Sequence, residues 1–366
     1  MSETSDIAEQ PSPAAPPDLP AVAAPDLAAR AKAVERLDAL AVPAGSLGVL
    51  ADLGLWLTSL QGVCPPRPPA RARVVVVAAD HGIAAAGVSA YSSEVTALQV
   101  AATLEQAAPV AVTATVAGAS VRVIDAGLDR DAVLPGQERY RVRRGSGRID
   151  REDALTAAEV ETAIRIGRAL ADEEVDSGAD LLVPASLGVG ATTAASTLVA
   201  AVTGAEPVAV VGRGSGIGDD AWMRKAAAIR DALRRGKPHL RDPRALLRTI
   251  GGADLAVLTG FLVQASLRRT PVLLDGLVVG AAALLADDLA PGAHQWWLAA
   301  QQSPEPAMAL ILQHLQLVPV LDLQVRLGDG TGAVAVLPLV QAAAKLLGET
   351  AAAESSGITP VRAVTG

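Results

Sequence analysis

A carboxylate lies in the middle of a glycine-rich turn near the end of the chain, in the string RLGDGTGA at residues 326–333. Three glycines in five residues let the backbone turn sharply and approach a ligand closely. A loop of this kind would present Asp329 to a cleft. The same string also fits a tight turn with a solvated carboxylate. Similar loops recur earlier in the chain, and this recurrence favours the cleft.

A second glycine-rich string, GVGATT at residues 188–193, lies between an apolar run and a helix-compatible segment. Backbone N–H groups at the start of a helix can cradle a phosphate there, and Thr192 and Thr193 add hydroxyl donors. The string also fits a tight turn with threonine as N-cap, which is compatible with phosphate binding. A dinucleotide fingerprint would need a third glycine where Thr193 stands, and the chain has no GxxxxGK[ST] string. These absences disfavour an NAD enzyme and a Walker-type phosphate loop.

A third string, GRGSGIG at residues 212–218, ends another apolar run and precedes a helix that carries Lys225. Arg213 in the turn and Lys225 in the helix could both reach an anion held by this loop. A solvated face of basic residues explains the same pattern. The residues alone leave both interpretations open.

Other chemistries find little support. The single cysteine excludes an intramolecular disulfide and a CxxC metal site, and the four histidines are scattered without metal-ligand spacing. Asp80, His81 and Ser89 suggest a catalytic triad, but the chain contains no G-x-S-x-G string. We therefore set a hydrolase aside.

Composition excludes further classes. The 366 residues are 51% hydrophobic but only 2% aromatic, so alanine, valine and leucine must build the core. A formal net charge of -8 argues against nucleic acid as a partner. The acidic N-terminus does not resemble a signal peptide, and every long apolar stretch is interrupted by Asp, Arg, Gly or Pro. We expect a cytoplasmic protein without membrane contact.

The elements that position these loops are short apolar runs, most of them followed by alanine-rich, helix-compatible segments. The runs are residues 74–77, 121–124, 181–183, 208–211 and 272–274. Continuously apolar strands alternating with helices predict an α/β fold, with a mostly parallel sheet covered by helices on both faces. Ligands bind such sheets outside the carboxyl ends of the strands, which is where Asp, Gly, Ser and Arg collect here.

Further elements are predicted around this alternation. Residues 1–25 read as a disordered leader, because they contain few large apolar side chains. Helices are expected at 27–40 and from an N-cap at Ser46 to about residue 60. A helical pair fits residues 92–117, and a helix fits 334–347.

Taken together, the strings resemble one family, the nicotinate-nucleotide–dimethylbenzimidazole phosphoribosyltransferases. The resemblance runs from about residue 37 to 347 and rests on the number, order and spacing of the strings. They are PAGSLG at 43–48, DHG at 80–82, GVS at 87–89, GVGATT at 188–193, GRGSG at 212–216, GGAD at 251–254, PVLLDG at 271–276 and RLGDGTG at 326–332.

The resemblance implies a Rossmann-like α/β domain at 71–333 and a small helical domain built from both chain ends, 26–70 and 334–366, in a homodimer. It implies transfer of the phosphoribosyl group of nicotinate mononucleotide to a nitrogen of 5,6-dimethylbenzimidazole, with inversion at the anomeric carbon. The products are α-ribazole 5'-phosphate and nicotinate. No cofactor and no metal are expected, because the leaving group is nicotinate rather than pyrophosphate.

The resemblance also implies roles for individual residues. Asp329 corresponds to the general base. The ribose phosphate would be held by the two earlier loops and the lysine, namely Gly188, Gly190, Thr192, Thr193, Gly212, Arg213, Gly214, Ser215, Gly216 and Lys225. The aromatic acceptor would lie near Ser89, Tyr91, Gln99, Ser186, Leu187, Leu327, Gly328 and Gly330.

The chain departs from the family pattern at several polar positions. Asp329 replaces a glutamate and is one methylene shorter, Ser186 stands where the family usually has an acid, and Ala191 replaces an asparagine. Gln301–Gln302 lies where a histidine is usual, and Val42 where a lysine is frequent. Because these changes cluster at the acceptor, a different aromatic acceptor and a non-catalytic nucleotide-binding role stand as alternatives.

Overall fold

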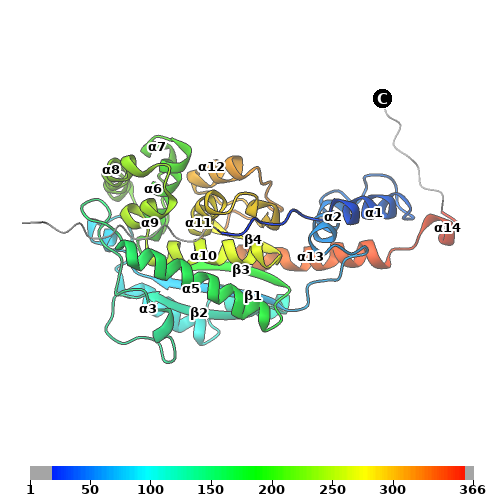
Figure 1. The fold of residues 1–366 in the computed structure, drawn as a ribbon, viewed down its shortest axis with the longest axis horizontal. Coiled ribbons are helices and arrows are strands. Elements are labelled where there is room, and N and C mark those ends of the chain that lie inside the picture. Colours follow the sequence, from blue (N-terminus) through cyan, green and yellow to red (C-terminus); the bar gives the residue numbers. More distant parts are fainter. Residues whose placement is uncertain (1–18, 359–366) are drawn as a thin grey trace, which may run out of the picture.

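A computed structural model describes residues 19–358, which fold around one five-stranded sheet (Figure 1). Every strand pair in this sheet is parallel, as the apolar runs predict. The strands are β1 Ala72–Ala79, β2 Ser120–Gly127, β3 Leu181–Leu187, β4 Val272–Leu274 and β5 Trp297–Ala299.

The strand order is β2-β1-β3-β4-β5. This is the order of flavodoxin-like doubly wound sheets, which differs from the 3-2-1-4-5-6 order of the Rossmann fold. From β1 the chain crosses to β2 at one side, and β3 then pairs with β1 on the other side. The point of reversal lies between β1 and β3, and a crevice forms at such a point beyond the carboxyl ends of the strands.

Helices connect the strands and make up most of the remaining chain. They are α1 Leu27–Asp38, α2 Val49–Gln61, α3 Glu94–Leu104, α4 Pro109–Ala117, α5 Ala157–Asp176, α6 Ala191–Thr203, α7 Pro207–Val210, α8 Asp219–Gly236, α9 Pro243–Ile250, α10 Ala253–Leu267, α11 Gly276–Leu289, α12 Pro306–Leu315, α13 Thr331–Glu349 and α14 Ala353–Ser356. Short 3-10 turns are Gly82–Ala86, Glu138–Tyr140, Lys237–His239 and Ala293–Trp296.

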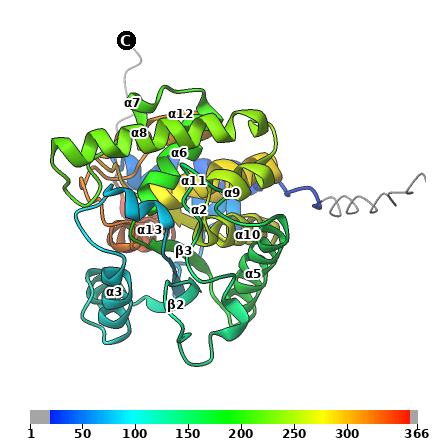
Figure 2. The same ribbon diagram turned by 90° about the vertical axis from the view of Figure 1, so that its left-hand side faces the viewer.

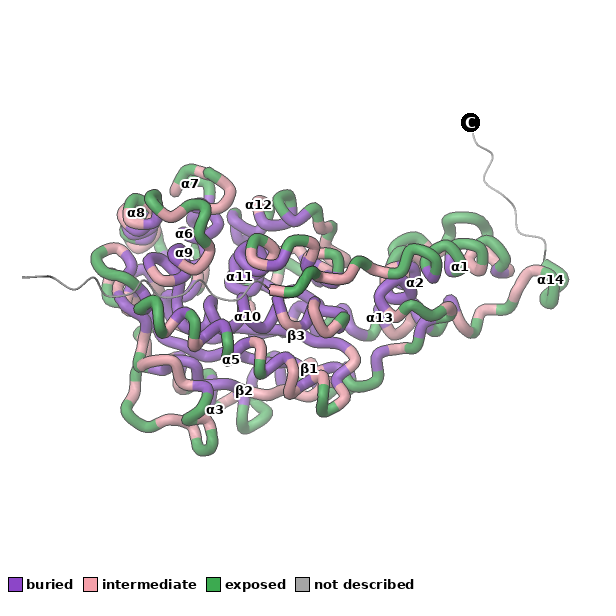
Figure 3. The backbone as a smooth tube through the Cα atoms, viewed as in Figure 1, coloured by how far each residue is buried: buried purple, intermediate pink, exposed green. Residues whose placement is uncertain are grey.

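Both faces of the sheet are buried, and Figures 2 and 3 show helices on either side of a buried centre. Along β1 the side chains alternate between two clusters, because successive residues of a strand point to opposite faces. Val75 and Val77 pack in the cluster built mainly by α5, α6, α10 and α11. Val74 and Val76 pack in the one that includes residues of α2, α4 and α13.

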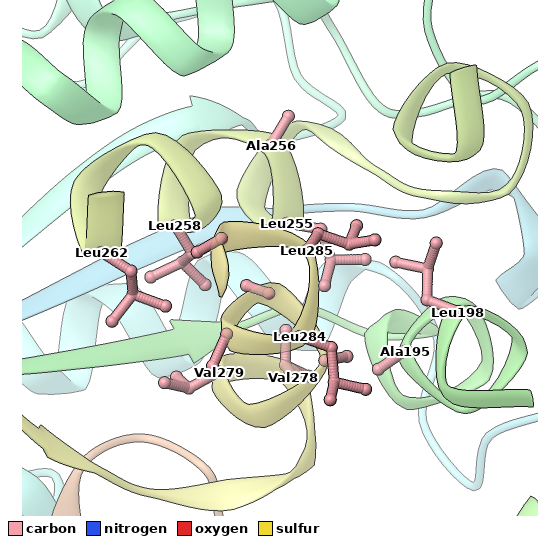
Figure 4. Close-up of a cluster of buried hydrophobic side chains, with 14 of the residues drawn as sticks. Ala195, Leu198, Leu255, Ala256, Leu258, Leu262, Val278, Val279, Leu284 and Leu285 are labelled. Atoms are coloured by element: carbon pink, nitrogen blue, oxygen red, sulfur yellow. The ribbon is translucent and has the colours of Figure 1, made fainter. Parts of the chain in front are cut away.

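The first cluster is made of aliphatic side chains and has few aromatic ones. In Figure 4, Leu198 of α6, Leu258 of α10 and Val279 of α11 converge with their neighbours in this cluster. Alanines let the helices approach closely where larger side chains would separate them. The low aromatic content of the sequence is therefore compatible with a dense core.

Two glycines fix the contact between α5 and α10. A Cβ on Gly167 would lie 1.9 Å from the Val257 carbonyl oxygen, and one on Gly260 would lie 2.2 Å from the Ile164 carbonyl oxygen. We expect Gly167→Ala to lower the free energy of unfolding by about 1–3 kcal/mol, because the helices must separate to admit the methyl group. Urea unfolding measures this difference. Gly348→Ala is the control, since its nearest non-local atom would be 3.7 Å away; an equal loss in both variants would contradict the steric explanation.

The first helices of the described chain meet its last helices beside the sheet. Leu40, after α1, forms an antiparallel bridge with Ala352, after α13. The Arg36 side chain donates hydrogen bonds to the carbonyls of Leu347 and Gly348, the latter at 2.7 Å. The first turns of α13 cover the sheet, while its last turns pack on α1 and α2 (Figure 1).

Several predicted elements need correction. Residues 208–210 lie in the short helix α7 instead of a strand, and Val211 is its C-cap. Pro207 at the first position of α7 has a helical φ and lacks the N–H that a strand would use. Ser46 does not cap α2; the chain turns through left-handed Gly45 and Gly48, and Gly48 is the N-cap. The three-residue strand β5 was not predicted.

The predicted leader also changes in part. Residues 1–18 lie outside the described residues, as do 359–366 of the predicted tail. Residues 19–25 are not a disordered segment: Leu19 and Val22 pack on the first core cluster, and the Trp296 indole donates a 2.8 Å hydrogen bond to the Ala23 carbonyl. These apolar contacts offset the ordering of a segment without regular structure.

Two segments are long and apolar enough to cross a membrane by length and composition, Glu94–Ala117 and Thr331–Glu349. The first is divided into α3 and α4 by residues 105–108. The second is α13, whose apolar side chains pack on the sheet and on α2. Both segments therefore belong to the packed fold.

Candidate active site

A cavity of about 290 Å³ lies beyond the carboxyl ends of β1 and β3, at the reversal point of the sheet. Its walls come from the loops that follow β1, β3, β4 and β5 and from the turn before α13. The lining residues are Val88, Ser89, Tyr91, Gln99, residues 186–192, Gly214, Ser215, residues 276–278, Ser303, Glu305 and residues 326–328.

The cavity brings together many of the residues predicted from sequence. Those on its wall are Ser89, Tyr91, Gln99, Ser186, Leu187, Gly188, Gly190, Thr192, Gly214, Ser215, Leu327 and Gly328. Those that do not line it are Thr193, Gly212, Arg213, Gly216, Lys225, Asp329 and Gly330. Loops separated by more than two hundred residues thus share one site.

The loop that follows β3 begins in close contact with the end of β1. A Cβ on Gly188 would lie 2.2 Å from the Ala79 carbonyl oxygen, so a side chain at this position would push the loop away from β1. Gly190 has a left-handed φ of 94° and precedes α6, which has no side-chain cap. The Ala191 and Thr193 N–H groups donate to the Gly188 and Gly190 carbonyls at 3.3 and 2.9 Å, which leaves the Thr192 N–H between them available to an anion.

Lys225 stands behind this loop. The amine on α8 donates a 2.9 Å hydrogen bond to the Thr192 hydroxyl, which is on the cavity wall. The side chain is almost fully buried, and burial lowers the pKa of Lys225 to about 8, an effect that the negative charge of Glu305 partly opposes. A buried cation within reach of a glycine-rich loop suits a phosphate dianion.

The loop at 212–216 already holds one carboxylate. The Gly214 N–H donates a 2.9 Å hydrogen bond to Glu305 Oε1, and a Cβ on Gly212 would collide with Glu305 Oε2. Ser215 Oγ accepts a hydrogen bond from Ala90 N at 2.9 Å, which ties this loop to the one after β1. Arg213 points elsewhere, since its guanidinium pairs with Asp219 at 2.7 Å.

The turn before α13 forms the opposite wall. The Ser186 N–H donates a 3.0 Å hydrogen bond to the Gly328 carbonyl, which fixes the turn against the end of β3. Asp329 is buried behind the wall, and its Oδ1 accepts a 3.0 Å hydrogen bond from Thr331 N at the start of α13. Gly330 has a φ of 96° and is the N-cap residue of that helix.

A second carboxyl group accompanies Asp329. Asp275 accepts hydrogen bonds from Gln301 Nε2 and Gly332 N, each at 3.0 Å. Burial raises the pKa of Asp275, and the nearby negative charge of Asp329 raises it further. Asp275 was not among the predicted site residues, although it lies in PVLLDG, one of the strings on which the family resemblance rests.

A buried cluster under Ser186 was also not predicted. The Ser186 hydroxyl donates a 3.0 Å hydrogen bond to Asp254 Oδ2, and His81 Nε2 lies 3.0 Å from Asp254 Oδ1. Burial disfavours the charged imidazole, but Asp254 and Asp80 outweigh this effect and raise the pKa of His81. Both Asp254 and His81 occur in strings that carry the resemblance, yet nothing in the sequence indicates that they meet. Within residues 19–358 no group of three His, Cys, Asp or Glu side chains is arranged to hold a metal ion.

Comparison with known proteins agrees with this geometry. A family model described as a phosphoribosyltransferase matches residues 22–358. The nicotinate-nucleotide–dimethylbenzimidazole phosphoribosyltransferase of Mycobacterium tuberculosis strain H37Rv is 53% identical over 94% of this chain and 95% of its own. That of Mycobacterium avium strain 104 is 54% identical over 92% of this chain and 97% of its own.

A crystal structure from Thermus thermophilus, of an enzyme with the same name, superposes with a TM-score of 0.86 at 38% identity. The match covers 92% of this chain and 100% of the crystallised one. Sequence and fold therefore agree, and the chain belongs to the nicotinate-nucleotide–dimethylbenzimidazole phosphoribosyltransferase family.

Proposed function

We propose that this protein transfers the phosphoribosyl group of nicotinate mononucleotide to 5,6-dimethylbenzimidazole, as its relatives are named for doing. The products are α-ribazole 5'-phosphate and nicotinate, for assembly of the lower-ligand nucleotide of cobalamin. The observation that carries the proposal is one cavity that combines phosphate-type loops with an acceptor wall, in a chain 53% identical to an enzyme of that name.

The phosphate subsite is the loop at 188–192 with Lys225 behind it. The ester phosphate accepts a hydrogen bond from the Thr192 N–H at the start of α6, and the Thr192–Lys225 pair supplies a hydroxyl and a positive charge. Anchoring at this end places the anomeric carbon toward the acceptor wall. Positioning of two reactants in this manner removes much of the entropic barrier to their reaction.

The acceptor subsite is the wall formed by Leu187, Leu327, Tyr91 and Gln99, all of which line the cavity. A ring nitrogen of the acceptor donates its lone pair to the anomeric carbon as the bond from that carbon to the nicotinate nitrogen breaks. The electron pair of the broken bond neutralises the pyridinium nitrogen. The new bond forms on the opposite face of the ribose, which gives the α configuration.

Asp329 is the proposed base that removes the remaining ring N–H proton. It is buried and lies in the turn whose Leu327 and Gly328 line the acceptor wall. Its Oδ1 accepts the hydrogen bond from Thr331 N, and the other oxygen, Oδ2, can accept the proton. A base needs a heavy-atom distance of about 2.6–3.2 Å to the group it deprotonates.

The transfer is tested by incubating the protein with nicotinate mononucleotide and 5,6-dimethylbenzimidazole and identifying α-ribazole 5'-phosphate by mass spectrometry. Nicotinate release only with other benzimidazoles, purines or phenols would assign a different acceptor. Calorimetric binding of nicotinate mononucleotide without nicotinate release from any acceptor would indicate a non-catalytic nucleotide-binding protein. Absence of binding would refute the proposal.

The affinity for nicotinate mononucleotide is expected to fall about tenfold between pH 7 and pH 9. Lys225, with a pKa of about 8, is mostly protonated at pH 7 and mostly neutral at pH 9 in the empty protein. The second ionisation of a phosphate monoester is near pH 6, so the ligand phosphate keeps its charge over this interval. Calorimetric Kd values at pH 7, 8 and 9 measure the change, and a constant Kd would contradict a role for this cation.

We also infer the wider organisation that the resemblance implies. Helices α1, α2 and α14 with the last turns of α13 would form a small helical domain, and two copies would form a cytoplasmic homodimer. An apolar surface on α3 and α4 supports the pairing, since Leu98 and Val116 are 67% and 83% exposed. Analytical ultracentrifugation tests the dimer, and a monomer at micromolar concentration would refute it.

A further inference from the structure

Ser186 presents a hydroxyl to the cavity from the end of β3, and a buried carboxylate fixes the orientation of that hydroxyl. Ser186 lines the cavity, and its Oγ lies 3.0 Å from Asp254 Oδ2. Asp254 is completely buried at the start of α10. Ser186 stands where the family usually has an acid, and in this protein the carboxylate of Asp254 lies directly behind the Ser186 hydroxyl.

The carboxylate determines the direction of the Ser186 proton. Asp254 Oδ1 lies 3.0 Å from His81 Nε2, so the imidazole occupies one oxygen of the carboxylate and leaves Oδ2 to accept from Ser186. The Ser186 hydroxyl has one proton, and this proton must point to Oδ2, because a hydrogen bond between two oxygens needs one of them to be the donor and the carboxylate oxygen can only accept. Only the lone pairs of Ser186 Oγ are left for a ligand.

The local backbone keeps Asp254 and His81 in this arrangement. A Cβ on Gly252 would lie 2.3 Å from His81 Cε1 and 2.9 Å from Asp254 Oδ1, so this residue must be glycine. The Ala253 N–H donates a 3.1 Å hydrogen bond to Ser146 Oγ, and Ser146 forms a bridge with His81. The pair is thus held from two strand-end loops and one helix.

We propose that Ser186 is the residue that recognises the acceptor, accepting a hydrogen bond from its ring N–H, and that Asp254 is a positioning residue acting through Ser186. An azole with one N–H and one imine nitrogen then binds in a single orientation. Its N–H points to Ser186, and its imine lone pair points away from Ser186, toward the anomeric carbon. The acceptor class is accordingly N–H azoles fused to an aromatic ring. A phenol, whose only donor is also its nucleophile, does not fit.

The same hydrogen bond assists the transfer itself, and this part of the inference depends on the proposed function. When the imine nitrogen forms its bond, positive charge develops on the ring and strengthens the N–H donor. The Ser186 oxygen, polarised by the carboxylate behind it, stabilises that charge. The N–H then lies beside the turn of Asp329, because Ser186 N donates to Gly328 O. Asp329 removes this proton, and the neutral product results.

The test compares binding of benzimidazole with binding of benzoxazole, in which a ring oxygen replaces the N–H without a change of shape. The wild-type protein is expected to bind benzimidazole about ten- to a hundredfold more tightly, because benzoxazole offers a lone pair to an acceptor. Ser186→Ala should reduce this ratio to about one or two. In Asp254→Asn the amide N–H can donate a hydrogen bond to Ser186 Oγ, which turns the hydroxyl proton toward the cavity. The preference for benzimidazole over benzoxazole should then fall below that of the wild-type protein.

Ser303→Ala is the matched control. It removes another hydroxyl from the same cavity wall, where the Ser303 oxygen faces the Glu305 N–H at 3.5 Å and is not oriented by a carboxylate. It should leave the ratio of the two dissociation constants at the wild-type value. Circular dichroism shows whether Asp254→Asn folds. If it does not fold, the test rests on Ser186→Ala.

An unchanged ratio in Ser186→Ala would overturn the inference. The dissociation constants of benzimidazole and benzoxazole are measured by calorimetry without turnover. An unchanged ratio is therefore a separate outcome from a failure of the transfer reaction. A protein that binds benzimidazole with the expected preference but releases no nicotinate would retain the recognition and refute only the proposed catalysis.

Discussion

Replacing Lys225 with methionine is expected to weaken binding of nicotinate mononucleotide about a hundredfold while making the empty protein more stable. The loss of affinity follows from removal of the buried cation that supports Thr192 at the phosphate subsite. A hydrogen-bonded charge facing a phosphate contributes about 1.5–3 kcal/mol, which corresponds to roughly ten- to more than a hundredfold in affinity.

The gain in stability follows from the pKa of Lys225. Burial lowers it from 10.5 to about 8, so the folded protein disfavours the charged amine by about 3 kcal/mol relative to the unfolded chain. Below pH 8 both states carry the proton and the whole penalty applies. Between pH 8 and 10.5 only the unfolded chain is protonated, so stability rises with pH over that interval. Methionine removes the penalty, and at pH 7 we expect about 1–3 kcal/mol of stabilisation.

Calorimetry and urea unfolding at pH 7 measure the two effects on the same samples. Arg230→Met is the control, because it removes one positive charge from the same helix at an exposed position paired with Asp231. It should change neither quantity appreciably. Unchanged affinity in Lys225→Met would exclude this lysine from the phosphate subsite. Lower stability would show that contacts of the buried amine outweigh the free-energy cost of burying its charge.

Replacing Asp329 is expected to have its main effect on kcat. General base catalysis contributes about 10²- to 10⁴-fold, so Asp329→Asn should lower kcat by at least a hundredfold with little change in KM for nicotinate mononucleotide. Asparagine can still accept the hydrogen bond from Thr331 N that Asp329 now accepts. Loss of activity in this variant is therefore not explained by loss of the hydrogen bond from Thr331 N.

Two further variants separate the reach of the carboxylate from its hydrogen bond with Thr331 N. Asp329→Ala removes both the base and this hydrogen bond, so it should add a loss of about 1 kcal/mol in unfolding free energy to the same loss of kcat. Asp329→Glu keeps a carboxylate and lengthens its reach by one methylene, so it should retain activity. Single-turnover nicotinate release with saturating 5,6-dimethylbenzimidazole measures all three. If Asp329→Asn turns over as fast as wild type, the proton leaves by another route.

The sequence was sufficient for the parallel sheet because strands buried on both faces are continuously apolar. Residues 74–77 and 181–183 show this pattern, and both lie within observed strands. The same pattern failed at 208–211, where the proline before an equally apolar run starts a helical turn. Strand β5 was missed because a three-residue strand contains too few residues to show a period and depends on pairing with β4.

The site could be predicted where function depends on the backbone of a loop, and less well where it depends on tertiary contacts. The glycines at 188 and 190 mark a close approach and a left-handed turn, and both line the cavity. Arg213 was expected to face the same anion, but Asp219 six positions later attracts its guanidinium instead. Asp254 meets Ser186 from 68 positions further along the chain, a contact that no local pattern can indicate.

The position of α13 has a consequence for how the protein is made. Helices α1 and α2 emerge first from the ribosome, yet α13, which covers them, begins about 270 residues after α2 ends. At about 5–20 residues per second, the first two helices wait roughly 15–50 s for their partner. The turn that carries Asp329 appears equally late. Synthesis therefore completes the packing of the terminal helices and this wall of the cavity together, and a chain that stops before residue 326 has neither.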